Sequence, residues 1–352
     1  MKKYEALRNL FYRAAVYFIL IVSTLWIFSI FMRYPYLNSD QATIGGMVYG
    51  TAQKPYVYRA LIPQSVRLCS ALIPAGLESD IRQRLAGIEP LNGFFERKSW
   101  DNEYALENVI LILLLLLCMF GFTFSTGYLL DGIFRFRPAV VRDAVHILAI
   151  WCVAPFFDTE YIYDLSTLFL FTLALGLMVR CQFKWYFLVF LLACVNKETA
   201  VLLLLLFVMY YRTRMKKDLF VRRILVQAVV YCAVKGALTF IFRDNPGGVV
   251  EFHLFNHNYW LLTDPFPMSF VVQGILFLFL IFYRWTDKPL FLRYAMVWSI
   301  PLSALMLFFG YLEETRAALE LYPVLVLLSA HSLVSASGFV VEDTAKEHGV
   351  SE

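Results

Sequence analysis

Residues 111–122 read LILLLLLCMFGF, and residues 200–211 read AVLLLLLFVMYY. Both runs are continuously apolar and do not alternate with polar residues, which is the pattern of a membrane-spanning helix and not of a barrel strand. The whole chain agrees with them: 60% of its 352 residues are hydrophobic and 16% are charged, whereas soluble domains are roughly 45–50% apolar and about 25% charged. In lipid only helices or a closed barrel satisfy the backbone. The sequence therefore predicts an all-α, polytopic integral membrane protein.

Composition also argues against several classes of function. The net charge is only +4, and no basic tract alternates with aromatic residues, so nucleic-acid binding has little support. The six cysteines are scattered and form no CxxC pair, which indicates small apolar side chains in a membrane and not a disulfide framework. His253 and His257 are four residues apart, but no third ligand is placed beside them. We therefore predict no metal and no cofactor.

We expect about ten membrane segments, which make residues 1–352 one transmembrane domain. The segments are 14–32, 108–130, 144–157, 165–179, 224–242, 268–283, 292–309 and 317–334, together with two short helices within 185–211. The basic residues between them place both termini in the cytoplasm, with 335–352 as a cytoplasmic tail. Residues 33–107 form a long external loop with amphipathic surface helices. Within it, residues 56–73 are expected at the membrane surface, with Leu61, Val66, Leu68, Cys69 and Leu72 sharing an apolar face.

The segment 185–211 is the most informative for topology. Polar residues 196–199 (NKET) interrupt it, and a dense basic cluster at 212–223 follows it. One straight span would place that cluster outside, against the positive-inside rule, whereas a hairpin places it inside. Each arm has only about 11–13 residues and is shorter than a hydrocarbon core of about 30 Å. We therefore expect the tip, with Lys197 and Glu198, below the outer surface in a wet cavity lined by protein.

Acidic residues gather on the predicted outer side, with a few basic residues among them. They are Asp40, Asp158, Glu160, Asp164, Glu198, Glu313 and Glu314, together with Arg59, Lys197 and Arg316. Charges at the ends of apolar helices are costly unless they are paired or functional. The expected site is therefore one external cavity rich in carboxylates.

The acidic candidates each have a structural alternative. Asp40 is either a general base at the membrane surface or the Asx turn or cap that precedes a helix at 41–49. Asp158, Glu160 and Asp164 form either part of a recessed site or a solvated loop in which Asp164 caps the next span. In a recessed site their like charges can raise the pKa of one carboxyl group, which prepares it for acid–base chemistry.

The basic candidates, with the acids beside them, also have two interpretations. Lys197 and Glu198 are either ligands or a structural ion pair that staples the hairpin tip. Glu314 and Arg316 either open the last helix, with the acid near its positive end, or place the planar guanidinium to clamp a phosphate. Lys235 lies in the middle of a span, and pairing with a neighbouring helix is its only interpretation.

Several short motifs resemble the bacterial branch of the GT-C glycosyltransferase superfamily. They are an Asp early in the first external loop, Tyr58-Arg59-Ala60-Leu61-Ile62-Pro63, Tyr163-Asp164-Leu165, Asn196-Lys197-Glu198-Thr199 and Glu314-Thr315-Arg316. The resemblance implies an enzyme that takes a sugar from a polyprenyl-phosphate carrier and moves it to a lipid or glycan acceptor on the outer face. Asp40 stands alone, without a second acid, and no large soluble domain follows the last span. These departures leave a protein with the fold but without the activity as an alternative.

The resemblance also assigns roles to residues. It implies Asp40 as the catalytic residue, because a carboxylate must take the proton of the acceptor hydroxyl. It implies basic residues that stabilise the phosphate leaving group, for which Arg59, Lys197 and Arg316 are the candidates. The expected substrate-binding residues are Tyr58, Arg59, Asp158, Glu160, Asp164, Lys197, Glu198, Glu314 and Arg316.

The expected location is the bacterial inner membrane, with the active face outside. Three other functions remain open: a flippase or transporter for lipid-linked glycans, a glycan polymerase, and a non-catalytic membrane scaffold. A flippase predicts charges along a path through the bilayer, and Lys235 is the one strong mid-span candidate. The clustering of charges at one face favours the transferase and the polymerase over the flippase, and it does not separate these two from each other.

Overall fold

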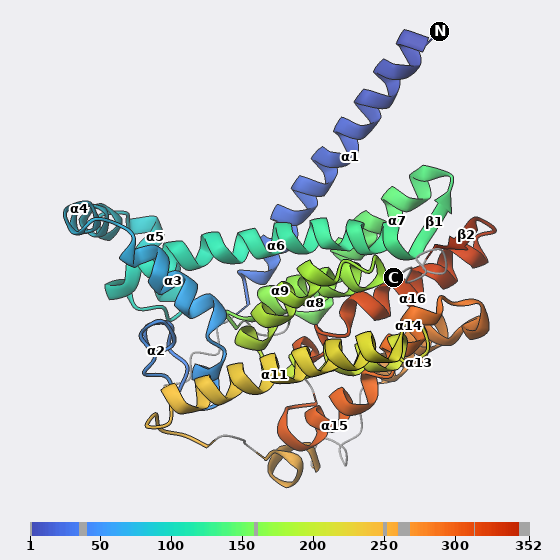
Figure 1. Ribbon diagram of the computed structural model, residues 1–352. Coiled ribbons are helices and arrows are strands. Elements are labelled where there is room, and N and C mark those ends of the chain that lie inside the picture. Colours follow the sequence, from blue (N-terminus) through green and yellow to red (C-terminus); the bar gives the residue numbers. More distant parts are fainter. Residues whose placement is uncertain are drawn as a thin grey trace.

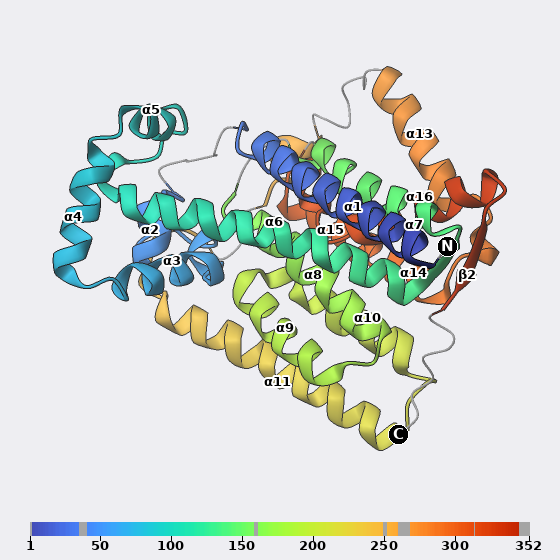
Figure 2. The same cartoon turned by 90° about the horizontal axis from the view of Figure 1, so that it is seen from above.

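The computed structural model describes residues 2–34, 41–157, 161–248, 252–259, 268–312 and 314–344. These residues form a helical bundle with a small two-stranded sheet at one end (Figures 1 and 2). The helices are α1 (Lys2–Phe31), α2 (Ile44–Tyr49), α3 (Leu61–Ala71), α4 (Ala75–Ala86), α5 (Glu89–Arg97), α6 (Ala105–Ile133), α7 (Ala139–Trp151), α8 (Asp164–Val179), α9 (Phe183–Asn196), α10 (Val201–Tyr211), α11 (Lys217–Ile241), α13 (Met268–Phe282), α14 (Leu290–Met296), α15 (Ser299–Phe309) and α16 (Tyr322–Ala336). The strands are β1 (Phe134–Arg137) and β2 (Val340–Asp343).

The helices have the length and surface that a lipid environment requires. Within the described residues, five are long and apolar enough to cross a membrane: Tyr4–Phe31, Asn102–Ile133, Ala139–Phe156, Lys217–Ile241 and Leu290–Phe309. Large apolar side chains on the outside of the bundle are exposed, among them Val229, Phe240 and Ile275. A soluble protein rarely exposes apolar surface on this scale. The nearly all-α fold therefore agrees with a membrane-embedded protein, whereas the number and sidedness of the spans stay predictions.

The bundle has two ends that differ in structure. The tip end carries the turn between α9 and α10, residues 196–200, together with α2 to α5. The sheet end carries β1 and β2 (Figure 1). Helix α1 packs against α6 and α7, and its N-terminal part projects away from the bundle (Figure 1).

The predicted hairpin is confirmed. Helices α9 and α10 run antiparallel, because the rings of Phe183 and Tyr211 are 5.3 Å apart near their far ends and those of Tyr186 and Phe207 are 5.9 Å apart further in. A 3₁₀ turn, Glu198–Ala200, joins the two helices. Local polarity explains the break, since residues 196–199 interrupt an otherwise continuous apolar run.

Two predicted spans have different bounds in the structure. The span expected at 292–309 lies within the candidate span Leu290–Phe309, which has a turn at 297–298 between α14 and α15. The turn arises because Pro301 has no backbone N–H and its ring clashes with the carbonyl of residue 297. The span expected at 317–334 begins only at Tyr322. Residues 315–318 form a separate 3₁₀ turn, and Pro323 lies in the first turn of α16, where proline is favoured.

The segment expected as an external loop is largely helical. Helix α2 begins at Ile44, and its N-cap is Thr43, whose hydroxyl accepts from the N–H of Gly46 at 3.0 Å. Asp40 is therefore not the N-cap of this helix, although its own position lies outside the described residues. The segment is held to the bundle by Arg82 of α4, which pairs with the fully buried carboxylate of Glu107 on α6 at 2.6 Å.

The apolar face expected along residues 56–73 is only partly correct. The range divides into a 3₁₀ turn, Tyr56–Tyr58, and helix α3. The buried side of α3 includes Ile62 and Val66, whereas Leu68 and Leu72 are exposed. The difference arises because α3 packs against both α6 and α9, so contacts between helices select the buried face.

The sheet joins two segments that are far apart in the sequence. Strand β2 follows α16 and pairs antiparallel with β1, so Phe134 lies opposite Asp343 and Arg137 lies opposite Val340. The segment expected as a cytoplasmic tail is thus packed at least to Thr344, whose N–H donates to the carbonyl of Ile133 at 3.0 Å.

A chain that ends at Ser337 is expected to fold with a free energy of unfolding about 1–3 kcal/mol lower than that of a chain that ends at Thr344. The truncation removes a short ladder of backbone hydrogen bonds, each with a small net contribution, and exposed ion pairs of Glu342 that contribute little. Unfolding in mixed micelles with increasing SDS measures the difference. A shorter chain that fails to fold would show instead that the sheet organises the bundle.

Candidate functional site

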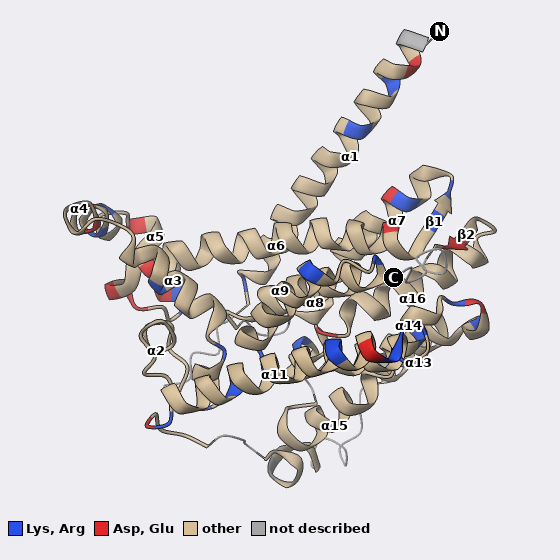
Figure 3. Cartoon of the chain, viewed as in Figure 1, with Lys and Arg blue, Asp and Glu red and all other residues tan. Residues whose placement is uncertain are grey.

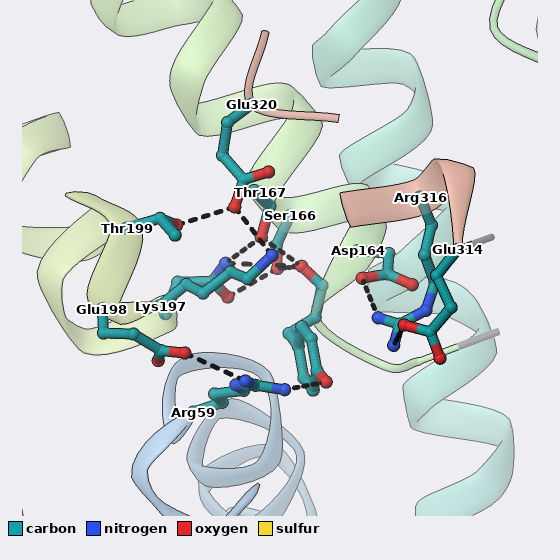
Figure 4. Close-up of polar contacts among 12 residues, drawn as sticks. Arg59, Asp164, Ser166, Thr167, Lys197, Glu198, Thr199, Glu314, Arg316 and Glu320 are labelled. Atoms are coloured by element: carbon teal, nitrogen blue, oxygen red, sulfur yellow. Dashed lines mark hydrogen bonds and ion pairs between the residues drawn. The ribbon is translucent and has the colours of Figure 1, made fainter. Parts of the chain in front are cut away.

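Charged side chains from distant parts of the sequence meet at the tip end. We call them the charge cluster: Arg59, Asp164, Lys197, Glu198, Glu314, Arg316 and Glu320 (Figure 4). Six of the seven were predicted site residues, and the structure brings them together. The predicted residues Asp40, Asp158 and Glu160 lie outside the described residues.

Arg59 links the segment before α3 to the hairpin tip. Its Nη2 donates to Oε1 of Glu198 at 2.9 Å, and its Nη1 donates to the hydroxyl of Tyr163. Burial opposes the charged form of Arg59, but the Glu198 carboxylate and the neighbouring tyrosines together outweigh it, so the pKa of Arg59 lies well above its ordinary value. The guanidinium therefore stays charged in the site.

Lys197 and Glu198 do not pair with each other. Glu198 points to Arg59, whereas Nζ of Lys197 lies 2.7 Å from Oε1 of Glu320 (Figure 4). The same oxygen of Glu320 accepts from the hydroxyl of Thr199 at 2.7 Å. The Glu320 side chain has no exposed surface, and that of Lys197 is 10% exposed. This ion pair links the hairpin tip to the segment before α16.

Asn196 fixes the hairpin tip against α8. Its Oδ1 accepts from the hydroxyl of Ser166 at 2.6 Å, and its Nδ2 donates to the hydroxyl of Thr167 at 2.8 Å. Nδ2 also lies 3.3 Å from the carbonyl of Tyr163. All of these groups are buried. Because a buried amide with several partners has one favourable orientation, this network sets the position at which Lys197 and Glu198 leave α9.

Arg316 forms the second half of the cluster. Its Nη2 lies 2.6 Å from Oε2 of Glu314, and its Nη1 lies 3.6 Å from Oδ1 of Asp164, the first residue of α8. Oδ2 of Asp164 accepts from the backbone N–H of Tyr161 at 3.1 Å. Burial opposes the charge of Arg316, but Asp164, Glu314 and the neighbouring tyrosines together outweigh it, so the pKa of Arg316 is raised. Its guanidinium therefore stays charged as well.

Stacked tyrosines separate the two arginines. The ring of Tyr161 stacks on Tyr56 at 5.9 Å and on Tyr163 at 5.3 Å between centroids. The guanidinium of Arg59 lies 4.4 Å from the ring centre of Tyr163, and that of Arg316 lies 4.1 Å from that of Tyr161. Aromatic faces attract cations, so the stack orients both guanidinium groups.

Several buried polar atoms of the cluster have unused hydrogen-bonding capacity. Nε of Arg59, Nε of Arg316, Oδ1 of Asp164 and Oε2 of Glu320 have no hydrogen-bond partner among the described residues. Buried polar atoms are nearly always satisfied in folded proteins, so these atoms are available to water or to a polar ligand. The cluster holds three cations against four carboxylates. Such a set can bind an anion at an arginine and accept a proton at a carboxylate.

The sequence predicts a role in the site for Tyr58 but not for Glu320. Tyr58 has a buried ring, and its hydroxyl has no hydrogen-bond partner in the described parts of the chain, so its expected role in substrate binding stays a prediction. Glu320 was missed. The available signal was a carboxylate inside the span expected at 317–334, because acids within apolar spans are rarely without a role.

Fold and site together define a class of protein, a multi-helix membrane protein with a buried charge cluster at one end of its bundle. A comparison of the chain with protein-family models, with curated proteins and with solved structures gives no match.

Proposed function

We propose that the chain is a glycosyltransferase of GT-C type, which moves a sugar from a polyprenyl-phosphate carrier to a glycan or lipid acceptor. In this proposal the protein spans a bacterial inner membrane about ten times, with both termini in the cytoplasm and the tip end outside. Basic residues at the sheet end, on β1 and at the starts of α7 and α11, support this orientation (Figure 3).

The observation that carries the proposal is the meeting of Arg59 and Arg316 with carboxylates at one end of the bundle. A lipid-linked donor requires a site near the membrane surface. Its phosphate leaving group requires fixed positive charge, and the planar guanidinium matches phosphate geometry. The unsatisfied Nε atoms of both arginines support a role in binding an oxygen-rich ligand.

The acceptor hydroxyl must lose its proton as the sugar is transferred. Asp40, in the first external loop, remains the proposed base. Asp164 and Glu198 then act mainly through the arginines, because each is paired with one of them. We propose that Asp164 orients the guanidinium of Arg316 and that neither carboxylate is the base.

The other functions make different demands on the cluster. A flippase needs charges along a path through the bilayer, and the gathering of the cluster at one end favours the transferase. A polymerase would use the same site and similar substrates. A scaffold would tolerate replacement of Arg316 and Asp40.

Changing Arg316 to Lys is expected to slow sugar transfer on the order of 100-fold, the loss typical for removal of one fixed donor. An ammonium group cannot face both Asp164 and Glu314 as the planar guanidinium does. Mass spectrometry of surface glycans and lipid-linked intermediates, over time in cells that lack the gene and regain either form, measures the change.

Arg243→Lys is the matched control, because this arginine is largely exposed and its ion pair is with its exposed neighbour Asp244. Cells without the gene should accumulate a glycan or intermediate one sugar short. A deletion that leaves every glycan and intermediate unchanged would refute the transferase.

A further inference from the structure

Lys235 on α11 is a buried cation without a hydrogen-bond partner. Its Nζ has no exposed surface and no such partner among the described residues. One helical turn earlier, the hydroxyl of Tyr231 donates to the backbone carbonyl of Glu198 at 3.1 Å. This contact places Lys235 beside the hairpin tip, where the charges of Glu198 and Arg59 both act on it.

Glu198 is held less firmly than Glu320, the carboxylate that pairs with the neighbouring residue Lys197. Among the described residues, the carboxylate of Glu198 pairs with Nη2 of Arg59, and the Glu198 side chain is 46% exposed. Glu320, in contrast, is fully buried and accepts from both Lys197 and Thr199. Glu198 therefore has open space beside it and one contact to break if it moves.

Arg59 and Lys235 both lie near Glu198, but in the described structure the carboxylate pairs with Arg59 alone. The ammonium of Lys235 has no hydrogen-bond partner among the described residues. An unpaired ammonium in apolar surroundings is costly unless it gains a counter-ion. An anion that binds Arg59 would free Glu198 to pair with Lys235.

We propose that Glu198 is an exchangeable counter-ion: a phosphate group takes its place at Arg59, and the released carboxylate pairs with Lys235. The ligand chemistry is a phosphate monoester or diester. That this phosphate belongs to the lipid-linked sugar donor rests on the proposed function. The exchange explains why α11 holds an ammonium with no partner next to a pair that is already complete.

The exchange predicts opposite effects for two substitutions. Glu198→Gln removes the competing carboxylate and is expected to tighten phosphate binding about tenfold. Lys235→Met removes the ammonium group with which the released carboxylate pairs, and it is expected to weaken phosphate binding about tenfold. In the Glu198→Gln background, Lys235→Met is expected to change affinity less than twofold, because no carboxylate remains to be received.

The binding of farnesyl phosphate, inorganic phosphate and farnesol to the purified full-length protein in nanodiscs tests these expectations. Farnesol, which has no phosphate, should not respond to either substitution. Glu103→Gln is the control, because Glu103 is an exposed acid at the same end of the bundle. Thermal unfolding of each variant separates a loss of binding from a loss of fold, and Lys235→Leu provides a second apolar replacement.

Two results would overturn the exchange. Weaker binding after Glu198→Gln in a folded protein would mean that Glu198 only positions Arg59. An equal loss from Lys235→Met in both backgrounds would mean that Lys235 binds the phosphate directly. Suppose that Glu198→Gln tightens and Lys235→Met weakens phosphate binding, but deletion of the gene leaves all glycans and intermediates unchanged. The proposed function then fails and the exchange stands. If sugar transfer is demonstrated but the two substitutions do not have these opposite effects on phosphate binding, the exchange alone fails.

Discussion

Lys197→Met is expected to lower the free energy of unfolding by about 3–5 kcal/mol, the cost of leaving a buried charge without its partner. The Glu320 carboxylate has no exposed surface, and loss of the ammonium leaves it with the hydroxyl of Thr199 as its described donor. Burial of an uncompensated carboxylate is far more costly than the loss of one ordinary hydrogen bond. SDS-induced unfolding in mixed micelles measures the change.

The matched control is Lys184→Met, the same replacement at an exposed position near the start of α9, for which we expect a change below about 0.5 kcal/mol. The double variant Lys197→Met with Glu320→Gln is expected to regain most of the loss, because a neutral amide keeps the bond from Thr199 without a buried charge. A loss from Lys197→Met no larger than that of the control would show that the pair does not staple the hairpin tip.

Asp40→Asn is expected to reduce sugar transfer by a factor of about 10²–10⁴, the usual contribution of a general base. The amide keeps the size of the side chain but cannot take the proton of the acceptor hydroxyl. Mass spectrometry of surface glycans and lipid-linked intermediates, in cells that lack the gene and regain the variant, measures the effect. A glycan one sugar short, with normal accumulation of the protein, is the expected result.

Asp80→Asn is the control for this substitution, because Asp80 is an exposed acid on α4 in the same long segment. Full restoration of the glycan profile by Asp40→Asn would remove Asp40 from the mechanism and favour the Asx turn. The cap of α2 would not explain such a result, because Thr43 occupies that position. The chemistry would then need another carboxylate.

Sequence reasoning located most of the candidate site but not its pairing. Arg59, Asp164, Lys197, Glu198, Glu314 and Arg316 stood out as charges at the ends of apolar segments, and the structure brings them together. The partners were not predictable. Lys197 and Glu198 are neighbours in the chain, yet each pairs with a residue more than a hundred positions away, since the rotation of each helix decides which side chains meet.

The apolar helices and the hairpin could be predicted from the sequence, because both follow from local patterns: continuous apolar runs, and four polar residues that interrupt one of them. Three features are visible in the folded chain alone: Glu320 joins the cluster, β2 pairs with β1, and Lys235 lies beside Glu198. These features depend on the packing of distant helices. In a chain this apolar many faces can be buried with similar gain, so periodicity alone does not select the neighbours.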